Sequence, residues 1–496
     1  MKITRLHVKL NLIMKAVAKK SILSGHITVP GSKSHTIRAL ILASMAEGTS
    51  HISNPLPSND CLSTVKAVKQ VGAEVLMDGD VWTVHGAGRN LHLPEAGQAG
   101  GDLSAASVSG AKGGLIDVGN SGSLMYFLCP VLSTLPGDCT FTGDESICRR
   151  PVNHLVDALS QLGAQGKCLN GGDTPPFSFC GPIDVERELV TGGELSQYIS
   201  GFMMAASRLN GTLHMKLTNP KETPYLTMTR IWLESLGVPV EISPDFRDIK
   251  VKGPVQIQAF DRAVPSDWEG VAFPLIAALV SGSSIVIDNI DGSGSQGDDK
   301  IVEVLQSVGA DIVWDKKAQT LSVNSGAGRG AGSGLGYVAG SGLGRSGTEG
   351  RGLLTTKNLP GGQLAVEMSA FPDAICALAV MACFIEGKTV FTDIDICRKK
   401  ETDRIKAMVS ELSKLGAHLE DQGDQLVVYG DGGRSLHGGA VESYKDHRIV
   451  MSLACLGLGL AEGESVEVSD AEWCSVTFPH FFEVMNKIGA GFVVSE

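Results

Sequence analysis

The chain has 496 residues, a formal net charge of −12, 43% hydrophobic residues and 19% charged residues. This length is too great for a single hydrophobic core, so we expect two or more domains. The acidic balance argues against a nucleic-acid-binding surface, which needs a basic face. Any site for an anionic substrate must therefore concentrate its lysines and arginines locally.

The N-terminal segment lacks the apolar core and the cleavage site of a signal peptide. The longest apolar runs fall short of the roughly 18–20 residues that cross a bilayer. The eleven cysteines form no CxxC pair and no metal-ligand spacing, a pattern typical of reduced thiols. We therefore expect a cytoplasmic protein without a membrane span or a metal site, and Met14 is an alternative start to Met1.

An internal repeat is the strongest sign of organisation. Six helix-like stretches are each followed by a glycine, which favours the left-handed backbone conformation that often ends a helix. These glycines are Gly72, Gly163, Gly237, Gly309, Gly416 and Gly489. A second set of glycines stands between an apolar helix and an alternating strand, at Gly48, Gly137, Gly211, Gly282, Gly387 and Gly463. The two sets have similar spacings, which predicts six α/β units.

Two long intervals in the repeat contain glycine-rich stretches, at residues 97–114 and 325–352. The second has no apolar periodicity and is interpreted as a flexible surface insertion, with an interaction segment as the alternative.

Small polar residues precede the first helix of each unit, as in Pro30–Thr36, Gly119–Ser123 and Asp446–Arg448. Such helix starts leave backbone N–H groups free, and the helix dipole favours anions there. If several of these starts converge between two domains, they form an anion-attracting cleft. Fold alone does not choose the chemistry of such a cleft.

Basic clusters fall in the same loops, at Arg149-Arg150 and from Arg398 to Arg404. A charge run is more often a solvated helix face than a binding site. Here the position of the clusters beside the helix starts favours binding of phosphate or carboxylate, which arginine pairs hold in a bidentate manner.

These motifs together resemble the family of 5-enolpyruvylshikimate-3-phosphate synthases, the 3-phosphoshikimate 1-carboxyvinyltransferases. The resemblance runs in order from about Lys19 to the C-terminus. It is carried by Pro30–Ser34 with Arg38-Ala39, Gly119–Gly122, Arg150-Pro151, Ser196-Gln197, Asp373, Lys400–Arg404 and Asp446–Arg448.

The resemblance implies an α/β fold of two similar domains, each an inside-out α/β barrel of three repeats. One domain would comprise residues 1–31 and 265–496, and the other residues 32–264, with chain crossings near Gly31 and Pro265. Reaction would follow closure of the domains over both substrates. A monomer without metal or organic cofactor is implied, and phosphoenolpyruvate and shikimate 3-phosphate are the implied ligands, with no nucleic-acid or membrane partner.

In the family, the 5-hydroxyl of shikimate 3-phosphate adds to C2 of phosphoenolpyruvate, and phosphate then leaves. The resemblance implies catalytic roles for Lys33, Asp373 and Glu401. Phosphoenolpyruvate would be bound by Lys33, Gly122, Arg150, Gln197, Arg404 and Arg448. Shikimate 3-phosphate would be bound by Lys33, Ser34, Arg38, Ser196, Gln197, Tyr225, Asp373 and Lys400.

Five positions depart from the family pattern. Two usual cations and several polar contacts are replaced, by Tyr126, Leu195, Glu222, Ile396 and Val476. A different acceptor, or a catalytically weakened binding paralogue, therefore stays an alternative. A UDP-N-acetylglucosamine enolpyruvyl transferase shares the repeats but has a cysteine-bearing loop that Cys148 does not match in spacing. An RNA 3′-phosphate cyclase-like protein also has related repeats, but its motifs are not evident.

Overall fold

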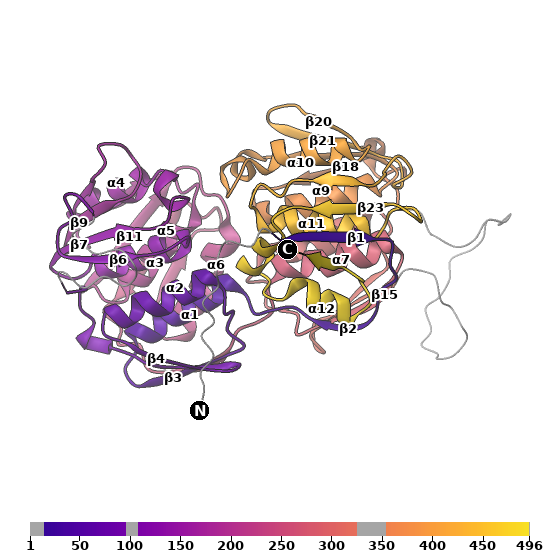
Figure 1. Cartoon of the computed structure of the whole chain (residues 1–496). Coiled ribbons are helices and arrows are strands. Elements are labelled where there is room, and N and C mark those ends of the chain that lie inside the picture. Colours follow the sequence, from indigo (N-terminus) through magenta and orange to yellow (C-terminus); the bar gives the residue numbers. More distant parts are fainter. Residues whose placement is uncertain (1–13, 96–107, 325–353, 496) are drawn as a thin grey trace.

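The computed structural model describes residues 14–95, 108–324 and 354–495. The predicted insertion at 325–352, residues 97–107 of the first glycine-rich stretch and Met1 lie outside the described residues, whereas Met14, the alternative start, is the first described residue. The described part forms two α/β halves (Figure 1). Within it, no helix is long and apolar enough to cross a membrane.

Each half contains three four-stranded sheets, and every sheet has the same plan: one parallel pair at one edge and antiparallel pairing elsewhere. In the first half, one sheet has the spatial order β14 (Asp261–Ala263), β3 (Thr49–Ser53), β5 (Val81–His85), β4 (Glu74–Asp78). A second sheet has the order β6 (Gly114–Asp117), β7 (Gly137–Thr142), β9 (Phe177–Gly181), β8 (Gln165–Cys168). The third has the order β10 (Leu189–Thr191), β11 (Gly211–Leu217), β13 (Asp248–Gly253), β12 (Val240–Ile242).

In the second half the sheets are β22 (Gly439–Val441), β23 (Ser465–Val468), β1 (Lys15–Lys19), β24 (Val493–Ser495); β16 (Ile312–Asp315), β17 (Thr320–Val323), β15 (Ser284–Asp288), β2 (Ser24–Thr28); and β18 (Gln363–Glu367), β19 (Gly387–Thr392), β21 (Gln425–Gly430), β20 (His418–Asp421). The two N-terminal strands thus pair with strands from the C-terminal half of the chain. Figure 1 shows them, in indigo, among the later elements.

Two classes of helix alternate along the chain. Six short apolar helices are buried along almost their whole length: α1 (Lys33–Met45), α3 (Gly122–Leu132), α5 (Ser196–Ala206), α7 (Trp268–Ser281), α9 (Ile375–Cys383) and α11 (His447–Gly457). The other six each bury only part of their surface: α2 (Asn59–Gln70), α4 (Asn153–Gln161), α6 (Thr223–Ser235), α8 (Lys300–Ser307), α10 (Arg404–Lys414) and α12 (Phe481–Lys487).

The predicted glycine repeat is confirmed, because all twelve glycines of the two sets have positive φ angles. Such angles are favourable only for residues without a Cβ atom. The repeat in the sequence therefore corresponds to a repeat in the backbone.

The buried hydrophobic residues form two clusters. One spans residues 37–264, and the other combines residues 16–29 with residues 268–492. These clusters support the domain boundaries proposed from the sequence, with crossings near Gly31 and Pro265.

The two crossing segments lie side by side. Gly31 and Ser266 form an isolated antiparallel bridge, the Ser32 amide donates to the Pro265 carbonyl at 2.8 Å, and the Asp267 amide donates to the Pro30 carbonyl at 3.0 Å. A Cβ atom on Gly31 would lie 2.1 Å from a backbone oxygen, so this crossing requires glycine.

A buried chain of hydrogen bonds connects the halves beside the crossings. Trp232 donates to Nδ1 of His35 at 3.0 Å, so the proton of the neutral ring lies on Nε2 and is donated to Ser295 at 3.1 Å. Ser295 in turn donates to Asp291 at 3.0 Å. Burial and the nearby Arg38 lower the pKa of His35 to about 3, against an opposing effect of Asp291.

We predict that His35 contributes a loss of stability at acid pH. The unfolded chain binds a proton on His35 below pH 6.5, whereas the folded chain binds it only near pH 3, so stability falls as pH decreases through this window. In His35→Gln the free energy of unfolding should depend less steeply on pH, by up to about 1.4 kcal/mol per pH unit. Urea unfolding between pH 7.5 and 5 measures the slope.

The matched control is His26→Gln, because His26 lies on an exposed part of β2 and pairs with Asp288 at 3.0 Å. Identical slopes for His35→Gln and wild type would contradict the buried neutral histidine.

Candidate active site

The starts of the buried helices are connected by side-chain contacts. Gln197 at the start of α5 donates to Ser123 in the first turn of α3 at 3.2 Å. Arg448 of α11 pairs with Glu269 of α7 and, through Nε, with Asp373 just before α9 at 3.2 Å. These contacts join the start of α5 to that of α3, and the start of α11 to those of α7 and α9, with a basic side chain in the second group.

Arg404 is the most connected cation of this region, and its side chain is fully buried. Its three nitrogens contact three carboxylates: Asp446 at 2.8 Å, Asp373 at 2.6 Å and Glu401 at 2.7 Å. Asp403 caps α10 by accepting from the Lys406 amide at 3.0 Å, which orients Arg404 at the first position of the helix. Arg404 therefore holds Asp373 and Glu401, two of the three residues predicted to be catalytic, in place.

Asp373 lies in the short η6 turn (Pro372–Ala374) and contacts three cations. Besides the two arginines, Lys400 approaches it to 3.2 Å. Burial raises the pKa of Asp373, but Lys400 and Arg404 outweigh this and lower it to about 2. The carboxylate is therefore ionised at neutral pH and can accept a hydrogen bond from a hydroxyl.

Glu401 also has a pKa well below its usual range. Its enclosure by protein raises the pKa, and Arg404, with contributions from Arg150 and Lys33, more than reverses that effect. The Glu401 side chain is 31% exposed, so a ligand can reach its carboxylate.

Lys33 and Arg150 differ from these paired cations. Within the described part of the chain, neither side chain makes a hydrogen bond or an ion pair, so both remain available to a ligand. Arg150 lies beside Gly122, where a Cβ atom would be 3.3 Å from its Nη1. Lys33 begins α1, and its charge opposes the rise that burial causes in the pKa of nearby Asp267.

Tyr225, Ser34 and Ser196 are placed near the cleft by α6, α1 and α5. The Tyr225 hydroxyl donates to Glu269 at 2.6 Å, which connects the two halves. Ser34 is half-buried beside Lys33. Ser196 is buried and donates to Glu222 at 3.1 Å.

Arg38 is engaged by the protein itself. Its guanidinium donates to Thr229 at 2.9 Å, to the Ser34 carbonyl at 3.0 Å, to Ser200 at 3.3 Å and to the Tyr225 carbonyl at 3.2 Å. It also lies over the ring of Phe127 on α3, 4.5 Å from the centroid. Arg38 thereby joins α1, α3, α5 and α6, and its predicted contact with shikimate 3-phosphate stays a prediction.

Several residues that the sequence analysis did not select also lie here. Asp267, Glu269 and Asp298 are buried carboxyl groups beside the predicted ligand-binding residues. Burial raises the pKa of Asp267 to about 6, against the opposing charges of Arg448 and Lys33. Asp267 and Glu269 stand in the helix-start segment Ser266–Gly270, which was the available signal for them.

Four of the five residues that depart from the family pattern have uncharged side chains. Tyr126 packs against His154, 5.3 Å between ring centroids, and donates to the Pro151 carbonyl at 3.3 Å, next to Arg150. Leu195 precedes α5 and makes no cap hydrogen bond. Ile396 lies against the core of the second half, and Val476 ends the η8 turn (Ala471–Val476), 7% exposed. None of these four side chains is a cation.

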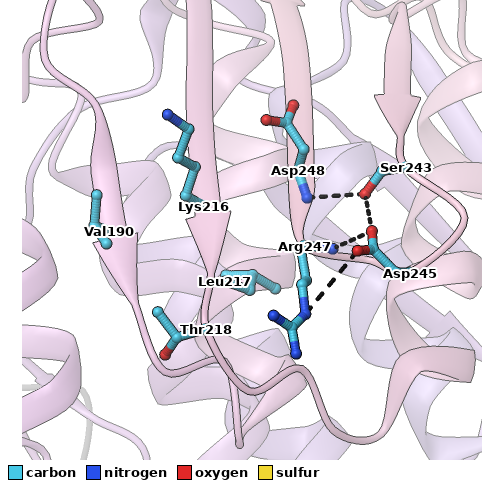
Figure 2. A pocket seen from close by; sticks show the side chains of 8 residues that line it. All are labelled: Val190, Lys216, Leu217, Thr218, Ser243, Asp245, Arg247 and Asp248. Carbon is cyan, nitrogen blue, oxygen red and sulfur yellow. Dashed lines mark hydrogen bonds and ion pairs between the residues drawn. The ribbon is translucent and has the colours of Figure 1, made fainter.

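An open depression of about 540 Å³ lies elsewhere, over β10, β11 and the segment before β13 (Figure 2). Its cations are already paired: Lys216 with Glu188 at 3.0 Å and Arg247 with Asp245 at 4.0 Å. It includes none of the predicted site residues, so we assign no function to it. Across the described ranges, no group of three or more His, Cys, Asp or Glu side chains could hold a metal ion.

We predict that Arg38→Met lowers the free energy of unfolding by about 3 kcal/mol, because it leaves buried hydrogen-bond acceptors unsatisfied. The urea midpoint measures this change. Arg89→Met is the control, since the Arg89 side chain is 81% exposed and pairs weakly with Glu47. Equal midpoints for both variants, with a raised requirement for shikimate 3-phosphate only in Arg38→Met, would instead indicate a ligand-binding role.

Comparison with solved structures gives the fold. The chain is similar to an EPSP synthase from Acinetobacter baumannii, with a TM-score of 0.74 and 24% identity over 98% of this chain and 100% of that chain. A second structure of EPSP synthase from the same organism gives a TM-score of 0.73. These similarities confirm the expected architecture of two inside-out α/β domains.

Comparison by sequence gives the family. The chain is 32% identical to the 3-phosphoshikimate 1-carboxyvinyltransferase of Ruminiclostridium cellulolyticum over 95% of this chain and 97% of that protein. It is 32% identical to the enzyme of that name from Halobacterium salinarum over 96% and 99% of the two chains. The model of the EPSP synthase (3-phosphoshikimate 1-carboxyvinyltransferase) family matches residues 17–331 and 344–485. The chain therefore belongs to the EPSP synthase family.

Proposed function

We propose that this chain transfers the enolpyruvyl group of phosphoenolpyruvate to the 5-hydroxyl of shikimate 3-phosphate and releases phosphate. The observation that carries the assignment is the position of Asp373. Its carboxylate contacts Arg404 and Arg448, which the family resemblance assigns to phosphoenolpyruvate, and Lys400, which it assigns to the acceptor. The carboxylate proposed for the reacting hydroxyl thus lies between the two proposed ligand sets.

Phosphoenolpyruvate is a polyanion, and its proposed ligands combine free and paired cations. Arg150 and Lys33 have no ion-pair partner within the described residues, so they can approach the phosphate without breaking an existing pair. Arg404 and Arg448 are held by carboxylates and offer fixed geometry for the carboxylate of the substrate. Gln197 and the backbone of Gly122 complete this set.

Shikimate 3-phosphate is proposed to lie against Ser34, Ser196, Tyr225 and Lys400, with Gln197 and Lys33 between the two substrates. Arg38 supports this side by holding the Tyr225 carbonyl. The proposed reaction uses no metal ion or organic cofactor, and we propose a monomer that acts in the cytoplasm.

The proposed chemistry requires three proton transfers: one from the 5-hydroxyl, one to C3 and one from C3. As the 5-hydroxyl adds to C2 of phosphoenolpyruvate, its proton passes to Asp373, whose low pKa keeps it ionised beforehand. C3 is protonated in the same addition, and the C3 proton is lost again when the phosphate leaves with the electrons of the C2–O bond. Lys33 and Glu401 are the proposed groups for these transfers at C3.

We predict that Lys33→Ala and Glu401→Ala each reduce turnover by roughly 100-fold or more, the usual effect of removing a positioned acid–base group. Phosphate release that requires both phosphoenolpyruvate and shikimate 3-phosphate is the measurement. Lys399→Ala is the control, because Lys399 is exposed one residue before Lys400. Near-normal turnover in both site variants would remove them from the mechanism.

We also predict that Val476→Lys lowers the half-saturating concentration of phosphoenolpyruvate. A regained charge-assisted hydrogen bond contributes roughly 1.5–3 kcal/mol, which is about 10- to 150-fold in affinity. Steady-state kinetics at saturating acceptor measure the change, and Ser475→Lys adds the same charge at an exposed neighbour. A loss of binding of both substrates in a folded Val476→Lys protein would show that this position does not face phosphoenolpyruvate.

A further inference from the structure

A buried carboxylate of the protein occupies donors that the proposed function assigns to the acceptor. Glu222 is 5% exposed and precedes α6 in a left-handed conformation, with φ 50°. Its Oε2 accepts from the Ser196 amide at 3.4 Å and from the Ser196 hydroxyl at 3.1 Å. Its Oε1 pairs with Lys400 from the other half of the molecule at 3.2 Å.

The surroundings of Glu222 match those of a bound anion, so the donors that hold it are where the phosphate of the acceptor would bind. Ser196 is the first residue of α5, where free amides and the helix dipole favour negative charge. Leu195, the preceding residue, offers no side-chain cap, so the Glu222 carboxylate is the anion that satisfies this helix start. Lys400 supplies the positive charge, and its Nζ lies 3.2 Å from the Glu222 carboxylate and 3.2 Å from the Asp373 carboxylate.

A phosphate group cannot share these donors with Glu222. An ionised phosphate within hydrogen-bonding distance of Ser196 and Lys400 would lie in contact with the Glu222 carboxylate, and like charges at such separation repel strongly in a buried site. Binding of an anionic acceptor therefore requires the carboxylate to leave both donors first. The favourable free energy of binding the phosphate is therefore reduced by the free energy of the Glu222 contacts with Ser196 and Lys400 that the phosphate displaces.

We propose that Glu222 is an internal ligand of the acceptor-phosphate site, which the phosphate of the acceptor must displace. This inference rests on the proposed function. Glu222 thereby determines acceptor specificity: it reduces the advantage of a phosphorylated acceptor over the same acceptor without phosphate. Through Lys400 it also joins the two halves.

The test compares binding of shikimate 3-phosphate and of shikimate, which lacks the phosphate, by titration calorimetry. In Glu222→Gln the side chain keeps its length and loses its charge, so affinity for shikimate 3-phosphate should rise by about tenfold or more. Affinity for shikimate should stay within about twofold of wild type. Glu222→Asn provides a second variant, because asparagine tolerates a left-handed backbone.

Asp393→Asn is the matched control. Asp393 pairs with Lys221, the residue before Glu222, at 2.5 Å, and this bridge also joins the two halves. Its removal loosens the same contact region without freeing Ser196 or Lys400, so both affinities should change by less than about twofold.

Three results would overturn the inference: unchanged or weaker binding of shikimate 3-phosphate in both Glu222 variants, an equal gain for shikimate, or an equal gain in Asp393→Asn. Phosphate release in the wild type separates this outcome from failure of the proposed function. Turnover that depends on both substrates, without a gain in the variants, contradicts only the role of Glu222. A phosphate-specific gain without any turnover supports the internal ligand and contradicts the proposed reaction.

Discussion

The arrangement of the candidate site depends on one buried cation. The Arg404 guanidinium binds carboxylates from three separate segments: Asp373 before α9, Glu401 before α10 and Asp446 at the start of α11. A buried arginine would be strongly unfavourable without such partners, and each carboxylate would be unfavourable without the arginine. The four groups therefore hold one another in place, and the pKa of Asp373 and of Glu401 falls as a consequence.

Around this cluster, the repeated α/β unit explains why charged groups meet at all. Each unit contributes one short apolar helix whose length is buried and whose start faces polar residues. The helices must bury their apolar surface, so their polar starts lie at the ends of the two cores, where side chains such as Ser121, Asp267 and Asp446 accept from their first amides. An overall charge of −12 is compatible with an anion site because the cations are gathered there and are partly neutralised by the protein.

The protein neutralises some cations of the site and leaves others unpaired. Lys33 and Arg150 have no ion-pair partner within the described ranges, whereas Lys400 and Arg448 are each held by two carboxylates. Free cations favour rapid capture of a polyanion, and paired cations favour fixed orientation. Glu222 and Glu269 extend this pattern across the cleft, because each contacts a residue of the opposite half. Of the departures from the family motif, Glu222 is accommodated by an ion pair with Lys400.

The sequence by itself determined the repeat, the family and the local positions of the candidate site residues. These features are local: a glycine that needs a positive φ angle, or a motif such as Lys400–Arg404, is readable from a few neighbouring residues. Only the tertiary structure decided which charges pair. Arg38 is a buried connector of four helices, and Glu222 reaches a lysine 178 residues away. The N-terminal strand β1 likewise joins strands β23 and β24 from the other end of the chain. Such partners are chosen by burial and by the geometry of packed helices and sheets, for which no short sequence pattern exists, because the free energy of an ion pair depends on what surrounds it.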